Sequence, residues 1–158
     1  MLKVIIAATI AMVARADINN FPSFDAFHAN CAIDVIYPGQ TCASVYNNMK
    51  AVLTKWQAGD PGKGIYAFKD VKEGTYFWMT RTTPVKKYVD DIAFEFTQTG
   101  ADCTVNSRSK SQSLSYYDYS TNYCNMWNPI TYTGKYANLT HKSCPFPADD
   151  PATVCLKY

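Results

Sequence analysis

Two adjacent acidic residues, Asp90 and Asp91, are the first candidates for chemistry in this sequence. A pair of carboxylates can act as general acid and general base when both reach the same substrate. These two lie in a stretch of alternating apolar and polar residues, and neighbours on a strand point to opposite faces of the sheet. A catalytic pair is therefore not expected, but Asp90 alone could be a partly buried, hydrogen-bonded anchor.

The other reactive residue types also lack a catalytic arrangement. His28 and His141 are isolated, and the sequence contains no Ser/His/Asp order, zinc-protease motif or phosphate loop. A zinc site would need clustered Cys and His ligands, which this spacing does not provide. We expect neither a metal nor a cofactor, and an enzyme is the least favoured of three functional classes.

Cysteines are the clearest structural signal. The six cysteines are Cys31, Cys42, Cys103, Cys124, Cys144 and Cys155. An even number with no C-x-x-C pair predicts disulfides in a secreted chain. The sequence cannot fix the connectivity. Short loops favour Cys31 with Cys42 and Cys144 with Cys155, each contributing about 3 kcal/mol, and this leaves Cys103 with Cys124.

The N-terminal residues predict secretion into an extracellular compartment. Lys3, the apolar run from Val4 to Val13 and Ala14-Arg15-Ala16 are typical of a signal peptide over residues 1–16. The run is shorter than the roughly twenty residues of a transmembrane helix, so no transmembrane anchor is expected. Cleavage would leave thirteen basic and thirteen acidic residues. This balance disfavours nucleic acid as a partner.

Length and composition indicate one folded domain. The chain has 158 residues, of which 47% are hydrophobic and 18% charged, which is too apolar for a disordered chain. We expect a single domain over residues 17–158, with an N-terminal lead (17–30) and a disulfide-tied tail (129–158). Asn138-Leu139-Thr140 is a glycosylation sequon, which would place Asn138 on the surface of a secreted glycoprotein.

The elements that must position these residues are a helix followed by strands. After Thr41, a possible cap, apolar residues recur at helical spacing: Val45, Met49, Val52, Leu53 and Trp56. The period then changes to two. Residues 64–71 and 75–82 predict a hairpin whose turn is formed by Lys72-Glu73-Gly74.

A second hairpin has the strongest pattern. Residues 88–97 alternate, Gly100-Ala101 interrupts them, and the strand pattern resumes at Cys103. The resulting register places Phe96 opposite Val105, Phe94 opposite Ser107, Ile92 opposite Ser109 and Asp90 opposite Ser111.

On the other face of this hairpin, Asp91 meets Lys110 and Glu95 lies diagonal to Arg108, which predicts a solvated ladder of charges. Asp90 should instead have hydroxyl or backbone partners. Replacing Asp90 by Ala is then expected to cost about 1 to 3 kcal/mol, and replacing Asp91 less than about 1 kcal/mol.

The inner face of the hairpin becomes polar at Ser107, Ser109 and Ser111. Small polar residues opposite large ones indicate tight packing against the helix, buried hydrogen bonds or a hollow. We favour packing that makes room for the helix that carries Trp56, with a ligand cavity as the main alternative.

The tail from Leu114 to Tyr158 is rich in tyrosine and asparagine. Flat rings with polar tips suit stacking on sugars or covering an apolar pocket. Irregular packing held by disulfides is the alternative that we favour. The candidate ligand-binding residues are Asp90, Ser107, Ser109, Ser111, Tyr116, Tyr119, Asn122 and Trp127.

Several of these residues together resemble a family. Tyr88-Val89-Asp90-Asp91-Ile92 with Phe94, Ser107-Arg108-Ser109 with Ser111, and Asp118 with Asn122 follow the order found in a domain of unknown function from bacteria and plastids. Uncharacterised secreted eukaryotic proteins with an Asn-Tyr-Cys-Asn element, here Asn122 to Asn125, are more similar still. The resemblance implies that Asp90, Arg108, Asp118 and Asn122 form one cluster. Tyr123-Cys124 replaces two arginines of the bacterial pattern, so no anionic site is carried over.

Together these observations predict an α+β fold, with one main helix on an antiparallel sheet of four or more strands and an irregular, disulfide-stabilised, Tyr-rich C-terminal extension. The leading functional hypothesis is a secreted, non-enzymatic binding module for a small apolar or glycan ligand. The alternative is a structural or interaction protein of an extracellular matrix, coat or secretion, with another extracellular protein as its partner.

Overall fold

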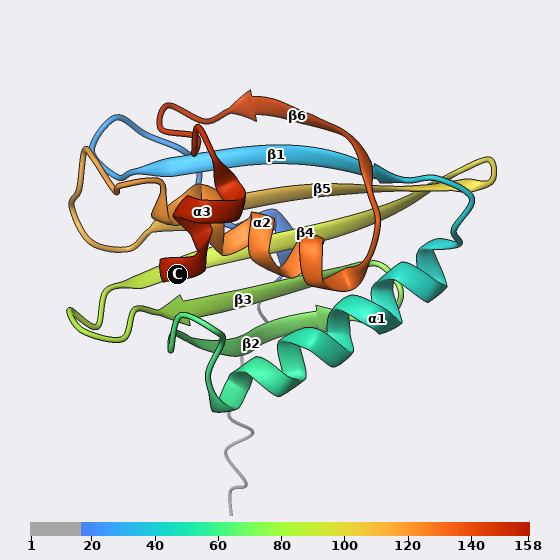
Figure 1. Ribbon diagram of the computed structural model, residues 1–158, viewed down its shortest axis with the longest axis horizontal. Coiled ribbons are helices and arrows are strands. Elements are labelled where there is room, and N and C mark those ends of the chain that lie inside the picture. The colour runs from blue at the N-terminus through green and yellow to red at the C-terminus, as the bar shows by residue number, and fades with distance from the viewer. Residues whose placement is uncertain (1–16) are drawn as a thin grey trace, which may run out of the picture.

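The computed structural model describes residues 17–158, and the predicted signal peptide, residues 1–16, lies outside the described residues. Six strands form one antiparallel sheet in the order β2-β3-β4-β5-β1-β6, and helices α1 and α2 lie over one face (Figure 1). The elements are β1 (Asn30–Tyr37), α1 (Cys42–Lys55), β2 (Ile65–Lys72), β3 (Tyr76–Thr82), β4 (Val89–Thr99), β5 (Asp102–Ser111), α2 (Thr121–Thr133), β6 (Ala137–Ser143) and α3 (Pro151–Val154). Every helix within residues 17–158 is too short or too polar to cross a membrane. The predicted α+β class is confirmed.

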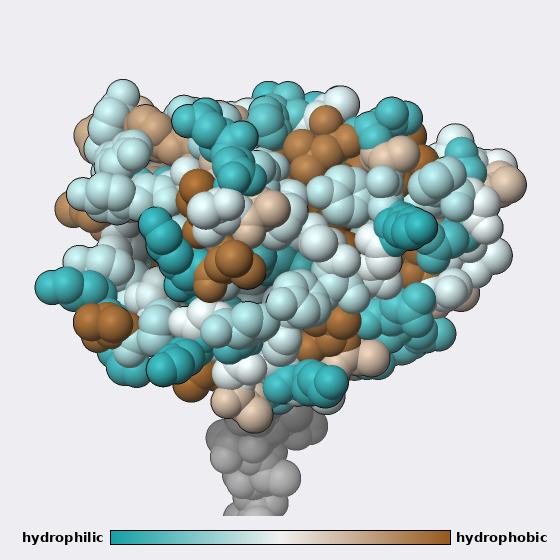
Figure 2. All heavy atoms as spheres, viewed as in Figure 1, coloured by the Kyte–Doolittle hydropathy of each residue, from teal (hydrophilic) through white to brown (hydrophobic). Residues whose placement is uncertain are grey.

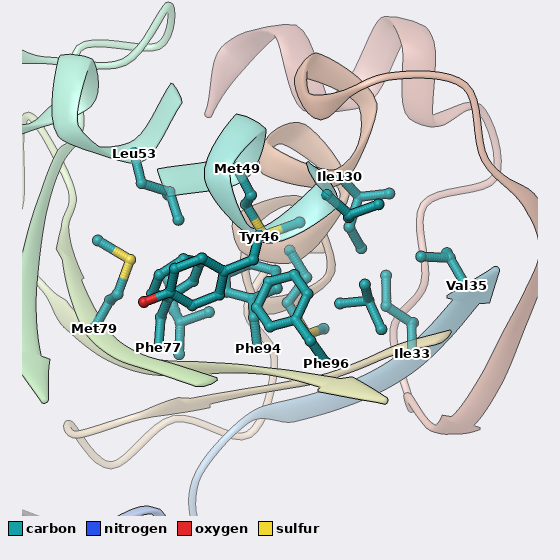
Figure 3. Close-up of a cluster of buried hydrophobic side chains, with 14 of the residues drawn as sticks. Ile33, Val35, Tyr46, Met49, Leu53, Phe77, Met79, Phe94, Phe96 and Ile130 are labelled. Atoms are coloured by element: carbon teal, nitrogen blue, oxygen red, sulfur yellow. The ribbon is translucent and has the colours of Figure 1, made fainter. Parts of the chain in front are cut away.

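The predicted helix is α1. The Thr41 hydroxyl caps it by accepting a hydrogen bond from the backbone N–H of Ser44 at 3.3 Å. Its apolar face buries Val45, Met49 and Leu53 completely. Figure 3 shows Met49 and Leu53 directed towards the sheet, together with Tyr46 from the same helix and Ile130 from α2. This packing closes the main hydrophobic core.

Both predicted hairpins are present, and the register of the second is confirmed. Strand β4 pairs with β5 so that Phe96 faces Val105 and Asp90 faces Ser111. On the other face, Arg108 Nη2 donates to Glu95 Oε1 at 2.7 Å, which is the predicted diagonal pair. The local turn and the two-residue period were sufficient to fix this pairing.

The predicted solvated ladder on the outer face of the sheet is wrong at one end. The N-terminal lead lies behind the sheet in Figure 1 and packs Phe21 against Trp78 and Ala93. Asp91 and Lys110 are only 3% and 8% exposed. Lys110 Nζ donates to Ser23 O and to Asp25 Oδ2 at 2.6 Å instead of pairing with Asp91. Strand parity gave the correct face but could not reveal that another segment covers it.

The C-terminal region is more regular than predicted. It contains the 13-residue helix α2, which carries Pro129 in its interior, and the edge strand β6. The sequence of α2 lacks an apolar stripe because it buries asparagines, including Asn122 and Asn125, against a polar part of the sheet. This polar packing is the physical reason that a helix was not expected here.

All six cysteines are paired, but none of the pairings favoured by loop length occurs. The disulfides join Cys31 to Cys144, Cys42 to Cys103 and Cys124 to Cys155. Cys31 and Cys42 cannot meet because β1 begins beside Cys31 and runs away from it, at about 3.3 Å per residue, towards Tyr37. Each observed bond instead joins elements that the fold makes neighbours. Such disulfides fit a protein from an oxidising, extracellular environment.

Candidate ligand-binding site

The inner face of the sheet, which carries the helices, changes from apolar to polar along the strands. Near the core, Phe77 of β3 lies opposite Phe94 of β4. At the far end, Arg81 of β3, Asp90 of β4 and Ser111 of β5 form one row across three strands. These three side chains are at most 8% exposed. We call this row and the side chains bonded to it the polar end.

Asp90 lies at the centre of the polar end. Its Oδ1 accepts a hydrogen bond from the Ser111 hydroxyl at 2.8 Å, and its Oδ2 accepts one from the Asn125 amide at 2.8 Å. Burial raises the pKa of Asp90, although the hydrogen bonds from Asn125 and Ser111 act in the opposite direction. The serine partner agrees with the expectation of hydroxyl ligands, whereas the asparagine partner was not predicted.

Helix α2 supplies the second layer of the polar end. Ser109 Oγ donates to Asn122 Oδ1 at 2.7 Å and accepts from Asn125 Nδ2 at 3.2 Å. Asn122 Nδ2 lies 2.7 Å from Asp118 Oδ2 and 3.1 Å from Ser111 Oγ. Asp118 also accepts the backbone N–H of Asn122 at 2.8 Å, so it satisfies a free donor in the first turn of the helix. One connected network therefore ties β5, α2 and the segment before α2 together.

Pro129 lets the backbone of α2 join this arrangement. A proline has no N–H, so the carbonyl four residues earlier, that of Asn125, lacks its usual helical partner. The buried Tyr66 hydroxyl donates to that carbonyl at 3.0 Å. Burial raises the pKa of Tyr66, which keeps this hydroxyl protonated as a donor.

A buried ion pair completes the polar end. Arg81 Nε donates to Asp60 Oδ2 at 2.7 Å, and both side chains are fully buried. Arg81 Nη1 reaches Asn125 Oδ1 at 3.4 Å, while Nη2 is the one buried side-chain polar atom among residues 17–158 without a hydrogen bond. The guanidinium lies so close to Gly64 that a Cβ there would come within 2.3 Å of it. A side chain at position 64 would therefore have to displace the guanidinium from its place.

A pocket of about 490 Å³ opens onto the polar end. Asp90 and Ser111 line it. Its walls come from the β3–β4 connection (83–86 and Tyr88), the segment before α2 (113–115 and 117–119), the first residue of α2 (Thr121) and the C-terminal residues Lys157 and Tyr158. Tyr158 is held in place because Asn128 Nδ2 donates to its carbonyl at 2.7 Å and its own hydroxyl donates to Tyr119 O at 2.9 Å. We call this cavity the site pocket.

Three exposed aromatic rings and one half-buried ring continue from the rim of the site pocket across the surface. Tyr119 lies against Tyr117 with ring centres 4.6 Å apart, and Tyr117 lies against Phe146 at 4.7 Å. Phe146 in turn contacts Tyr116 at 5.8 Å. Tyr117 and Tyr119 line the pocket, whereas Tyr116, 78% exposed, lies beyond it. We call these four rings the aromatic strip.

The structure places the predicted ligand-binding residues in five different surroundings. Asp90, Ser111 and Tyr119 line the site pocket, and Tyr116 belongs to the aromatic strip outside it. Ser109 and Asn122 are buried behind the pocket in the network, and Ser107 is bonded to the carbonyl of Ile33 at 2.7 Å. Trp127 packs against the main core. Ser109 and Ser111 therefore make room for α2, not for α1 as expected.

Arg108 does not belong to the cluster that the family resemblance implied. Its side chain is on the outer face, where it pairs with Glu95 and lies over the Phe21 ring at 4.8 Å. Asp90, Asp118 and Asn122 do come together, as the resemblance implied. The arginine of the cluster is Arg81, which occupies the inner face of β3.

Sequence reasoning missed Arg81, Asp60 and Asn125. One available signal was the spacing of Asn122, Asn125 and Asn128, which places the three on one side of a helix. Arg81 gave no such signal, because an alternating strand predicts only that its side chain faces the core side. Its partner Asp60 lies in a turn, whose position relative to β3 depends on the whole fold.

The polar end and the site pocket offer hydrogen-bond acceptors and flat rings. Two carboxylates, Asp90 and Asp118, line the pocket, and neither forms an ion pair with any described residue. In the part of the chain that the structure describes, no three or more His, Cys, Asp or Glu side chains are grouped to hold a metal ion. The arrangement is suited to binding a small molecule through hydrogen bonds and ring contacts.

These features define the protein as a disulfide-bonded α+β domain with a buried polar network beneath a surface pocket. The chain belongs to the family described as Protein of unknown function (DUF1499), which matches residues 16–126. The match includes the row formed by Arg81, Asp90 and Ser111 and ends inside α2. No curated protein and no solved structure matched the chain.

Proposed function

We propose that this protein is a secreted, non-enzymatic binding module that holds a small apolar or glycan ligand in the site pocket. The observation that carries the proposal is the pocket itself, with a volume of about 490 Å³, buried Asp90 and Ser111 at its floor and tyrosines at its rim. Ligand sites commonly combine about 300 to 1,000 Å³ of mostly apolar space with a few convergent polar groups.

A binding role is supported over catalysis by the state of the two carboxylates. Both oxygens of Asp90 accept internal hydrogen bonds, and its side chain is only 2% exposed. Asp118 is occupied by backbone and side-chain donors at the start of α2. Both groups are therefore fixed acceptors: internal donors hold them in place, and each keeps a lone pair that can accept a hydrogen bond from a ligand without a proton transfer.

Secretion is supported by the predicted signal peptide and by the three disulfides. We also place the chain with the secreted eukaryotic proteins that carry an Asn-Tyr-Cys-Asn element. In this chain Asn122 and Asn125 of that element bind the polar end, and Cys124 is bonded to Cys155. Asn138 is exposed on the edge strand β6, where a glycan can be attached.

Native mass spectrometry of protein secreted from its own source tests the binding function. We expect a bound species that dissociates on unfolding, is recovered chemically unchanged, and is absent from the variant Asp90→Asn. The variant Asp34→Asn is the control, since Asp34 is on β1, outside the site pocket. A protein without a bound species that also ignores an apolar dye such as Nile red and a glycan array would overturn the proposal.

A second candidate is an interaction protein of an extracellular matrix, coat or secretion. The aromatic strip favours it, because contiguous exposed aromatic surface is typical of partner-binding sites. Elsewhere on the helical face, apolar residues are scattered among hydrophilic ones (Figure 2). Sedimentation of the protein with and without Tyr116→Ser separates the two candidates, since concentration-dependent association that this change abolishes would support the interaction role.

A further inference from the structure

We infer that the ligand is a neutral oligosaccharide whose terminal sugar fills the site pocket and whose following units lie along the aromatic strip. This inference rests on the proposed binding function and names the class of ligand. Its support comes from the acidic groups at the floor of the pocket, the basic groups in its wall, and the aromatic rings that continue beyond it.

The floor of the pocket selects a ligand that donates hydrogen bonds. The carboxylates of Asp90 and Asp118 are acceptors, and the Ser111 proton is already directed to Asp90. Hydroxyl groups or an ammonium group would supply the donors. An anionic ligand would be repelled by these carboxylates at close range.

The wall of the pocket disfavours the cationic choice. Lys86 and Lys157 also line the pocket and are exposed, so a positive ligand would be repelled as it enters. Acidic groups at the floor and basic groups in the wall together favour an uncharged ligand rich in hydroxyls. A zwitterion such as a free amino acid would also match both signs, and the experiment below includes it.

The rings indicate the shape of the ligand. Tyr88, Tyr117, Tyr119 and Tyr158 surround the opening, and a sugar presents an apolar C–H face to a ring while its edge hydroxyls stay polar. The strip continues through Phe146 to Tyr116, outside the pocket. A single sugar would leave these outer rings unused, whereas a chain of sugars would cover them.

The test uses the full secreted chain on an array of neutral, anionic and cationic glycans, with binding of free amino acids and of Nile red measured alongside. Calorimetry with a length series of the best-bound sugar follows. We expect neutral glycans to bind, and the affinity to rise roughly two- to tenfold with each added unit up to about three units, as ring contacts accumulate. Tyr116→Ala should lower the ratio of trisaccharide to monosaccharide affinity. Tyr132→Ala is the matched control, because Tyr132 is 53% exposed on α2 and contacts Trp56, away from the strip.

The possible outcomes separate this inference from the binding function. Equal affinity at all lengths, or a preference for charged glycans or amino acids, would overturn the oligosaccharide inference while the pocket remains a binding site. Binding of Nile red with no binding of any glycan would have the same meaning and would favour an apolar ligand. If neither dye, amino acid nor glycan binds, both statements fall.

Discussion

Replacing Asp91 by Ala should destabilise the protein far more than an outer-face position normally would. Asp91 Oδ1 accepts the indole N–H of Trp78 at 2.8 Å and lies 3.1 Å from Lys69 Nζ, and its Oδ2 accepts from Gln112 at 2.9 Å. Trp78 is 4% exposed, so its N–H would be left without an acceptor and without water. An unsatisfied buried donor costs about 1 to 3 kcal/mol, and Lys69, being half in solvent, adds little.

We therefore expect a loss of about 2 to 3 kcal/mol for Asp91→Ala, in place of the value below about 1 kcal/mol that a solvated ladder would give. Glu95→Ala is the matched control on the same strand and face. Its partner Arg108 is 36% exposed and Glu95 38%, and such a surface pair contributes about 0 to 1 kcal/mol.

Urea melts under oxidising conditions, followed by tryptophan fluorescence, measure both losses. The slope of the free energy with denaturant should stay constant, since neither change alters the surface exposed on unfolding. Similar losses below about 1 kcal/mol for both variants would refute the reasoning. They would mean that the N-terminal lead does not shield Trp78 and Asp91 from water in solution.

Three further results are expected. Asp90 binds a proton more tightly in the folded protein than in the unfolded chain, because its pKa is raised on folding. The free energy of unfolding should therefore fall as the pH rises from about 4 through the raised pKa, and denaturant melts of Asp90→Asn across this range should show a flatter dependence on pH. Non-reducing peptide mapping should recover the disulfide between Cys124 and Cys155, and recovery of a Cys144–Cys155 disulfide would contradict the fold of the tail. Replacing both Cys124 and Cys155 by Ser should lower the free energy of unfolding by about 3 to 4 kcal/mol, as expected for a separation of 31 residues. Arg81→Met should lower the free energy of unfolding by about 3 to 5 kcal/mol, because Asp60 then stays buried without its cation. Adding Asp60→Asn should restore part of the lost stability in a double-mutant cycle, and a fully additive cycle would show that the two residues are not coupled.

Local patterns in the sequence predicted the parts of the fold that depend on neighbours along the chain. The helical spacing from Val45 to Trp56 and the two-residue period of β4 led to α1 and to the pairing of Asp90 with Ser111. The same parity placed Asp90 inside and Arg108 outside, and both placements are confirmed. These inferences needed only the geometry of one helix or one hairpin.

The remaining features depend on contacts between distant segments. Parity states which face Asp91 occupies, but not that residues near Phe21 cover that face. Asn122 and Asn125 of helix α2 bond to groups from the sheet, and the carbonyl freed by Pro129 accepts from the Tyr66 hydroxyl. None of these partners is close in sequence, so the segment could only be described from its composition. The disulfide pairing was wrong for the same reason.

The polar side chains at one end of the inner face of the sheet need a physical reason. An apolar inner face would have continued the packing seen around Phe77 and Phe94, and replacing a buried ion pair by hydrophobic residues of similar size is often neutral or stabilising. On the inner face, this chain instead buries Arg81, Asp60 and Asp90 with two asparagines at the polar end, where Asp90 lines the site pocket. Stability alone does not account for this burial of charge. Their arrangement fixes the position of the Asp90 carboxylate at the floor of the pocket, which is what a binding site requires of a polar group that must meet its ligand without rearranging.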